Sequence, residues 1–270
     1  MVSAAKLRKA QNAILTMRPF AAKLTEIMQN ISATMDESAE SVYTKERIPE
    51  RILVIAIASN RGLCGPFNAN VAKEVINRIN TVYHSQYQAG KLDIFTVGKK
   101  LNDFLKARKY MVALRNDELL DSLTFENVLP VAEKLMNDFA SGKYDRIEII
   151  YNQFKNAAVQ ILTREQFLPV AQKQETAGLV KKLNTDYIFQ PSKAEIITEL
   201  IPKSLKIQLY KALLDSVASE QGARMTAMHK ATDNAQELLK NLKLSYNKAR
   251  QAAITNEILE IVSGAEALRG

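Results

Sequence analysis

The feature that most constrains this fold is a long stretch without helix breakers near the end of the chain. From Ser204 to Leu268 there is no proline, and glycine occurs only as Gly222 and Gly264. Because these two residue types most disfavour a helix interior, the stretch predicts one continuous helix. At 1.5 Å per residue it would reach ~95 Å, far longer than a compact domain of 270 residues needs. Spacings of three and four alternate along it, as in a coiled coil, at Met225, Met228, Thr232, Ala235, Leu239, Leu242, Tyr246, Ala249 and Ala253.

The first segment of the chain repeats this pattern. Its apolar seam, with most lysines and arginines off the seam, consists of Leu7, Ala10, Ile14, Met17, Ala21, Leu24, Met28, Ile31 and Met35. Pro19 lies inside the pattern and predicts a local kink. Two heptad helices at opposite ends of a chain can pair as an antiparallel coiled coil. An amphipathic helix lying on a globular core is the alternative for the first segment.

The middle of the chain alternates strand and helix patterns. Strands are predicted at 51–58, 92–97 and 146–151, with 159–167 as a hairpin partner of the third, and helices at 67–87, 101–109 and 124–140. This order indicates a largely parallel sheet with helices on its faces and one antiparallel strand. Further on, 172–185 predicts a loop, 187–189 a short strand, and Ser192 a helix cap with Glu195 completing a capping box.

These patterns predict an α/β fold in which a Rossmann-like domain is inserted between two long terminal helices. The expected domains are residues 1–45 for the first coiled-coil helix, 50–192 for the α/β domain and 200–270 for the long last helix. A sheet domain that carries a long helical rod is suited to reaching or to transmitting force. It is poorly suited to enclosing a substrate.

The net charge and the cysteine content indicate the kind of partner and the redox compartment, but they do not identify the partner. The net charge of +8 favours an acidic partner, which could be nucleic acid, an anionic membrane surface or an acidic protein. Cys64 is the single cysteine, so no internal disulfide can form. The residues from Met1 to Lys6 lack the apolar core of a secretory signal, and we expect a reducing compartment. No apolar run approaches the ~20 residues that a bilayer-spanning helix needs.

The turn from Ser59 to Asn68 is the one place where a nucleotide fold would hold phosphates. It matches neither the dinucleotide-binding nor the P-loop glycine pattern, and Pro66 removes a backbone donor at the helix start. We therefore interpret it as a structural turn, and Cys64 as a small buried apolar residue. Neither His84 nor His229 belongs to a set of three acids, thiols or histidines at metal-ligand spacing, and His229 should be exposed. The sequence predicts no catalytic residue, no cofactor and no metal site.

Between Lys203 and Arg250 there are nine lysines and arginines against four acids. A solvated coiled-coil face, a basic helix that binds DNA, and a contact surface for an acidic protein all remain possible from the charges alone. A nucleic-acid-binding or scaffold coiled coil is the alternative function for the whole chain, and a nucleotide-using enzyme is a further one.

Several segments together resemble the gamma subunit of F-type ATP synthases. The segments are Met1–Gln11, the turn Asn60–Gly65 with Phe67 and Asn68, Tyr151–Phe154, Gln221–Ala235, Leu244–Glu257 and Glu260–Leu268, and the resemblance extends over essentially the whole chain. One departure is Pro66, which stands where the family usually has glycine. The single cysteine speaks against the chloroplast form, whose redox switch needs a cysteine pair.

The resemblance implies a non-catalytic central rotor. The coiled coil would turn inside a head of alternating alpha and beta subunits, and the α/β domain would contact the epsilon subunit and the ring of c subunits. Proton flow would drive the rotation that couples to ATP synthesis. By the same resemblance, Arg250 and Gln251 would contact a beta-subunit loop. The protein would lie peripherally on the cytoplasmic side of a bacterial inner membrane, in preference to the mitochondrial inner membrane, and would bind no nucleic acid.

In the family, the stretch that Met1–Gln11 resembles lies several turns inside the first helix. We therefore expect a reading frame that continues the seam upstream of Met1. The first helix, ending near Ser41, would span only ~60 Å against ~95 Å for its partner. Without further turns, apolar residues of the last helix would lack a partner, namely Ile254, Ile258, Leu259, Ile261 and Val262.

Overall fold

The computed structural model describes residues 2–32, 42–170 and 193–268. The chain divides into two units, Met1–Met225 and Thr226–Gly270, and each is described by itself. One helix, α6 (Lys193–Ala267), belongs to both. The predicted loop at 172–185, the strand at 187–189 and the cap at Ser192 lie outside the described residues. The predicted domain boundaries, at 1–45, 50–192 and 200–270, stay a prediction.

The first unit is built around a five-stranded sheet with the order β3-β2-β1-β4-β5. The strands are β1 (Ile52–Ile57), β2 (Leu92–Val97), β3 (Leu114–Arg115), β4 (Arg146–Phe154) and β5 (Gln160–Leu168). All neighbouring pairs are parallel except β4 with β5, which form the predicted hairpin. The prediction of a largely parallel sheet with one antiparallel strand is confirmed.

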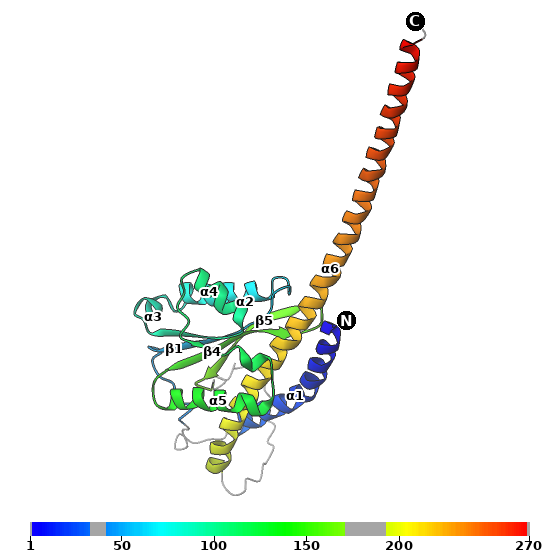
Figure 1. Ribbon diagram of the computed structural model, residues 1–270. Coiled ribbons are helices and arrows are strands. Elements are labelled where there is room, and N and C mark those ends of the chain that lie inside the picture. Colours follow the sequence, from blue (N-terminus) through cyan, green and yellow to red (C-terminus); the bar gives the residue numbers. More distant parts are fainter. Residues whose placement is uncertain (1, 33–41, 171–192, 269–270) are drawn as a thin grey trace, which may run out of the picture. The chain divides into compact units, whose positions relative to one another are not determined.

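Helices cover both faces of this sheet (Figure 1). On one face lie α2 (Phe67–Thr81), α3 (His84–Gln88) and α4 (Lys99–Ala107), and on the other lie α5 (Phe125–Ala140) and the first part of α6, with the short 3-10 helix η2 (Glu118–Leu120) beside them. The helix predicted over 67–87 is in fact two helices. The chain turns between them at Tyr83, whose ring is buried and whose hydroxyl donates to the Glu148 carboxylate.

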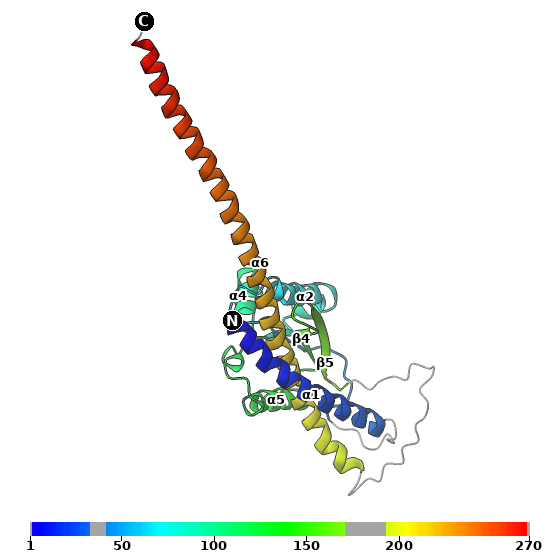
Figure 2. The ribbon, with the colours of Figure 1, turned by 90° about the vertical axis from the view of Figure 1, so that its right-hand side faces the viewer.

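The two terminal helices pack against each other within the first unit. Helix α1 (Val2–Ser32) continues through Pro19, and its buried residues Leu7, Ala10 and Ile14 share an apolar cluster with Leu214 and Ala218 of α6. Figures 1 and 2 show α1 running antiparallel to this part of α6. Antiparallel pairing of the two terminal helices is therefore confirmed over this stretch, but not along the predicted α6 seam. Of that seam only Met225 packs in this cluster, and its members from Met228 to Ala253 are exposed.

Helix α6 starts at Lys193, before the proline-free stretch, and continues through Pro202. The second unit consists of its continuation, and every described side chain from Met228 to Leu268 is exposed. Among the residues that the structure describes, no helix is long and apolar enough to cross a membrane.

Candidate functional site

The exposed part of α6 carries large apolar side chains that a solvated helix does not need. Leu238, Leu239, Leu242 and Tyr246 have exposed fractions of 60%, 56%, 59% and 68%. With Met228, Ala235, Ala249 and Ala253 they recur at spacings that place them on one side of a helix. A continuous exposed apolar surface of this kind marks a protein-binding site. We call residues 228–268 the exposed α6 segment.

The apolar stripe changes direction toward the end of this segment. Glu257 and Glu260 fall on the side of the helix that carries Leu239, Leu242 and Tyr246. The larger residues beyond Ala253 continue at spacings of four, three and seven on a neighbouring side, at Ile254, Ile258, Ile261 and Leu268. The apolar surface of the exposed α6 segment therefore does not follow one straight line along the helix axis.

Charge is also segregated along the exposed α6 segment. From Leu238 to Asn256 there are four basic residues and no acid. From Glu257 to Leu268 there are three glutamates and no lysine or arginine. The basic stretch fits an acidic protein surface, whereas the acidic end would repel nucleic acid.

Arg250 and Gln251 lie in the basic stretch, and both side chains are exposed. As consecutive helix residues they point about 100° apart, so they do not form one flat surface. In the part of the chain that the structure describes, neither side chain has an ion pair or hydrogen bond; the Gln251 carbonyl accepts from Thr255 Oγ1 at 2.8 Å. Both side chains are available to a partner.

A second functional feature is the place where α6 contacts the turns at the carboxyl ends of the strands. We call it the α6 contact site, formed by α6 residues 219–224, the β1–α2 turn (58–66) and the β4–β5 turn (155–159). Cys64 and Phe67 are buried against Ala223. Arg224 donates to the main-chain oxygens of Arg61 and Gly62, at 3.3 Å each.

An ion pair within α6 positions the Arg224 side chain. Its guanidinium lies 2.7 Å from a carboxylate oxygen of Glu220, one turn earlier. Burial raises the pKa of Glu220, and the charge of Arg224 acts in the opposite direction. The mostly buried pair orients Arg224 toward the carbonyl groups of the β1–α2 turn.

Helix α6 also lies close to β4 and to the β4–β5 turn. Ser219 Oγ donates to the Asn152 carbonyl at 2.9 Å, and Asn152 Nδ2 donates to the Phe67 carbonyl at 3.3 Å. Gly222 lies so near the β4–β5 turn that an added Cβ would be 3.1 Å from Ala157 Cα. The lack of a side chain at Gly222 is what permits this approach.

The interior of the β1–α2 turn is filled by its own side chains. The Ser59 amide donates to Asn68 Oδ1 at 3.0 Å, and Asn68 Nδ2 lies 3.2 Å from Cys64 Sγ. In open parallel sheets, ligands bind at the carboxyl ends of strands where the strand order reverses, here between β1 and β4. That position is taken by α6 and by these side chains. This packing supports the interpretation of Ser59–Asn68 as a structural turn.

An ion pair between the partly exposed Arg18 and the buried Asp215 joins α1 to α6, and Arg18 also contacts β4. Arg18 lies 2.8 Å from Asp215 Oδ1 and also donates to the Phe154 carbonyl. Asp215 is fully buried, and its Oδ2 has no hydrogen-bond partner among the described atoms. Burial raises the pKa of Asp215, while Arg18 acts to lower it. This pair was not predicted from the sequence, although an acid between Leu214 and Val217 in an apolar run was a signal for it.

The remaining candidate residues hold no site. Cys64 is 1% exposed and His229 is exposed, as predicted. His84 is exposed as well, with its ring 2.9 Å from the Gln88 amide. Within 2–32, 42–170 and 193–268 no group of histidine, cysteine and carboxylate side chains could hold a metal ion.

Comparisons with known proteins agree with this architecture. A family model described as ATP synthase matches residues 1–268. The protein named ATP synthase gamma chain from Flavobacterium psychrophilum is 59% identical over 271 residues, which cover 100% of this chain and 91% of that protein. The protein of the same name from Cytophaga hutchinsonii is 52% identical over 268 residues, covering 99% and 91%.

Two solved structures with this fold come from mitochondrial ATP synthases. The central stalk and c-ring structure from Tetrahymena thermophila aligns with a TM-score of 0.60 at 24% identity, over 86% of this chain and 96% of that chain. A Euglena gracilis structure described as OSCP, F1 and c-ring aligns with a TM-score of 0.59 at 21% identity, over 98% and 95%. At these identities the likeness concerns the fold.

Proposed function

The chain belongs to the ATP synthase gamma chain family, and we propose that it is the central rotor shaft of an F-type ATP synthase, without an active site of its own. In this proposal the exposed α6 segment turns inside a head of alpha and beta subunits. The first unit contacts the ring of c subunits and the epsilon subunit. The solved relatives, which are central-stalk and c-ring structures, support these partners.

One observation carries the proposal. A single helix of 75 residues is held by an α/β unit along its first half and exposes apolar and charged side chains along its second. Such a helix can carry rotation from one set of partners to another. Because its apolar and charged residues are unevenly distributed around the axis, each beta subunit would meet a different surface as the shaft turns. Unequal contacts shift the populations of open and closed beta conformations.

The absence of catalysis by the chain itself is part of the proposal. It is supported by α6 filling the place where a doubly wound sheet holds phosphates. The bacterial relatives support a location on the cytoplasmic side of a bacterial inner membrane, held there through the complex.

Arg250 and Gln251 are proposed to contact one beta-subunit loop at a time. An exposed arginine can bind a carboxylate through two parallel hydrogen bonds, and a glutamine can both donate and accept. The double variant Arg250→Ala with Gln251→Ala should slow ATP hydrolysis by the assembled head about tenfold or more, given about 1.5–3 kcal/mol for a bond to a charged group. The matched control is Asn247→Ala with Lys248→Ala, which removes one charge and one amide from the same exposed helix. Equal rates for the two double variants would refute the assignment.

The proposed function is tested by purification. An affinity tag on this chain should retrieve alpha and beta subunits in a complex that hydrolyses ATP, whereas the isolated chain should not. Robust hydrolysis by the pure chain would contradict the non-catalytic role. Salt-dependent binding to DNA, with no retrieval of alpha and beta subunits, would favour the alternative of a nucleic-acid-binding coiled coil.

A further inference from the structure

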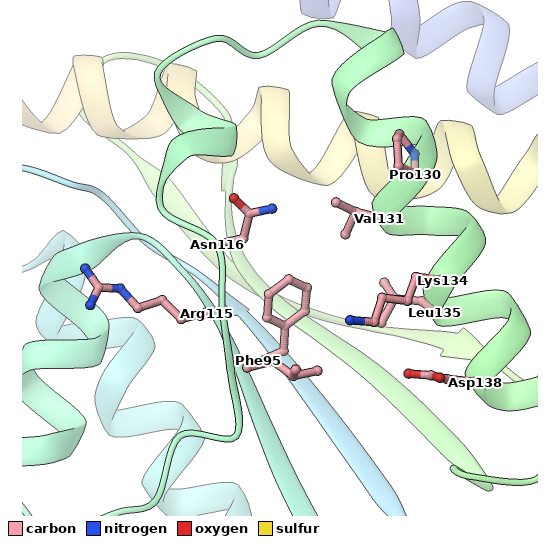
Figure 3. Close-up of a pocket in the computed structure, with 9 residues that line it drawn as sticks. Phe95, Arg115, Asn116, Pro130, Val131, Lys134, Leu135 and Asp138 are labelled. Atoms are coloured by element: carbon pink, nitrogen blue, oxygen red, sulfur yellow. The ribbon is translucent and has the colours of Figure 1, made fainter.

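The first unit has an open pocket that the α6 contacts do not use. It lies between β3, at the end of the sheet opposite β5, and helix α5, and has a volume of about 250 Å³ (Figure 3). Nine residues line it: Phe95, Leu114, Arg115, Asn116, Pro130, Val131, Lys134, Leu135 and Asp138. All of them belong to the first unit.

The pocket is open because β3 is only two residues long. Phe95 and Leu135 are buried at its base, and Leu114 and Val131 are half-buried on its walls. On its inner side the β3 segment bonds to β2 through Ala113 N and the Ile94 carbonyl, at 3.1 Å. No other described strand pairs with its outer side. An apolar pocket therefore adjoins an open sheet edge.

Two polar groups at the rim of the pocket can bind a partner, and both are hydrogen-bond donors. The Lys134 amino group points toward the ring of Phe95 in Figure 3, and it forms no ion pair with any residue that the structure describes. Asn116 Oδ1 accepts from the Leu119 amide at 3.2 Å, which leaves its amide nitrogen for another acceptor.

The other charges at the rim are already paired. Asp138 Oδ2 lies 3.0 Å from Lys143 Nζ, and Arg115 pairs with Asp117. Neither pair leaves an uncompensated negative charge at the rim. The available groups thus present one positive charge and one amide donor above an apolar base, which complements a carboxylate beside a bulky apolar side chain.

From this we propose that the pocket and the outer edge of β3 bind an extended segment of a partner protein. The segment carries one bulky aliphatic or aromatic side chain, which enters the pocket, next to an aspartate or glutamate, which meets Lys134. Peptides that add to a sheet edge take their affinity from main-chain hydrogen bonds and their specificity from side-chain pockets, as this arrangement would allow. The volume suits one side chain better than a drug-sized molecule, whose pockets run from about 300 to 1,000 Å³.

The test uses the assembled complex. A photo-crosslinking residue, p-benzoylphenylalanine, replaces Pro130, which lies exposed at the rim of the pocket. After irradiation in cells, the complex is purified through the chain and the crosslinked peptide is sequenced by mass spectrometry. We expect a peptide of one partner chain in which an aspartate or glutamate adjoins a bulky apolar residue.

Charge reversal separates specific binding from mere proximity. Lys134→Glu should lower the crosslinking yield about tenfold, since a bond to a charged group is worth about 1.5–3 kcal/mol. Lys106→Glu makes the same charge change at an exposed position of α4, on the other face of the sheet, and should leave the yield unchanged. No crosslink, a crosslinked peptide without an acid beside an apolar residue, or equal yields for the two variants would each overturn the proposal. The inference rests on the proposed function only in requiring the complex, and recovery of that complex is scored separately, before irradiation.

Discussion

The close approach of α6 to the β4–β5 turn makes Gly222→Ala an informative substitution. In the middle of a helix, glycine is normally less stable than alanine by about 0.5–1 kcal/mol, so the change would ordinarily stabilise the protein. At Gly222 the new Cβ would lie 3.1 Å from Ala157 Cα, 3.2 Å from the Ala157 carbonyl oxygen and 3.5 Å from a ring carbon of Phe154. Two of these three atoms are main-chain atoms, which cannot move aside as a flexible side chain can.

The net effect follows from two opposing terms. Overpacking a close contact costs about 1–3 kcal/mol, and the helical gain offsets about 0.5–1 kcal/mol of that. Gly222→Ala should therefore destabilise the chain by about 1 kcal/mol, and Gly222→Val by more. Gly264→Ala is the matched control, because it is the same change in the same helix at a position where a Cβ would meet nothing within 4 Å.

Urea unfolding of the full chain, followed by circular dichroism, measures the difference. A lower unfolding midpoint at unchanged slope identifies a loss of stability. We expect this for Gly222→Ala and no loss for Gly264→Ala. If Gly222→Ala is as stable as the unchanged chain, or more stable, α6 does not need this close approach, and the account of the α6 contact site is wrong.

Three further outcomes are expected. Gly98→Ala should cost roughly 2–4 kcal/mol in urea unfolding, because Gly98 has a φ of +116° and its added Cβ would lie 2.7 Å from the Ala58 carbonyl oxygen. Arg18→Met should cost about 2 kcal/mol, less than for a fully buried pair because Arg18 is more than a third exposed. It also removes a positive charge that opposes the raised pKa of Asp215. A carboxyl group whose pKa is raised in the folded state stabilises the fold at low pH and loses that contribution as the pH rises, so the deficit should grow as the pH rises above the usual titration range of a carboxyl group. The buried thiol of Cys64 should react with a thiol reagent at least about 100-fold faster after unfolding than before.

Elements that depend on local patterns were predictable from the sequence. The apolar, β-branched run at Ile52–Ile57 predicted β1, and the alternating apolar spacings predicted both terminal helices. Strand β3 was missed because two residues carry no periodicity, and it is recognisable only by its pairing with Phe95 and Thr96 of β2.

The site was less predictable, because its contacts join residues far apart in the sequence. The β1–α2 turn could be recognised as lacking a phosphate-binding pattern, but nothing in its sequence indicated that Arg224 would donate to its carbonyl groups. In the sequence Gly222 is only one of two glycines in a long predicted helix, whereas in the structure it is the residue that lets α6 approach Ala157. The contact of Arg250 and Gln251 with a beta subunit stays a prediction, since it involves a second chain.

Single-molecule rotation tests the central claim most directly. The chain with Cys64→Ser and Lys155→Cys, which moves the only thiol to the exposed β4–β5 turn, is assembled with alpha and beta subunits, and a gold particle is attached to the new cysteine. With the head fixed to a surface, ATP should drive continuous rotation of the particle in one direction. A particle that stays fixed while the same complexes hydrolyse ATP would contradict the proposal that this chain is the rotor.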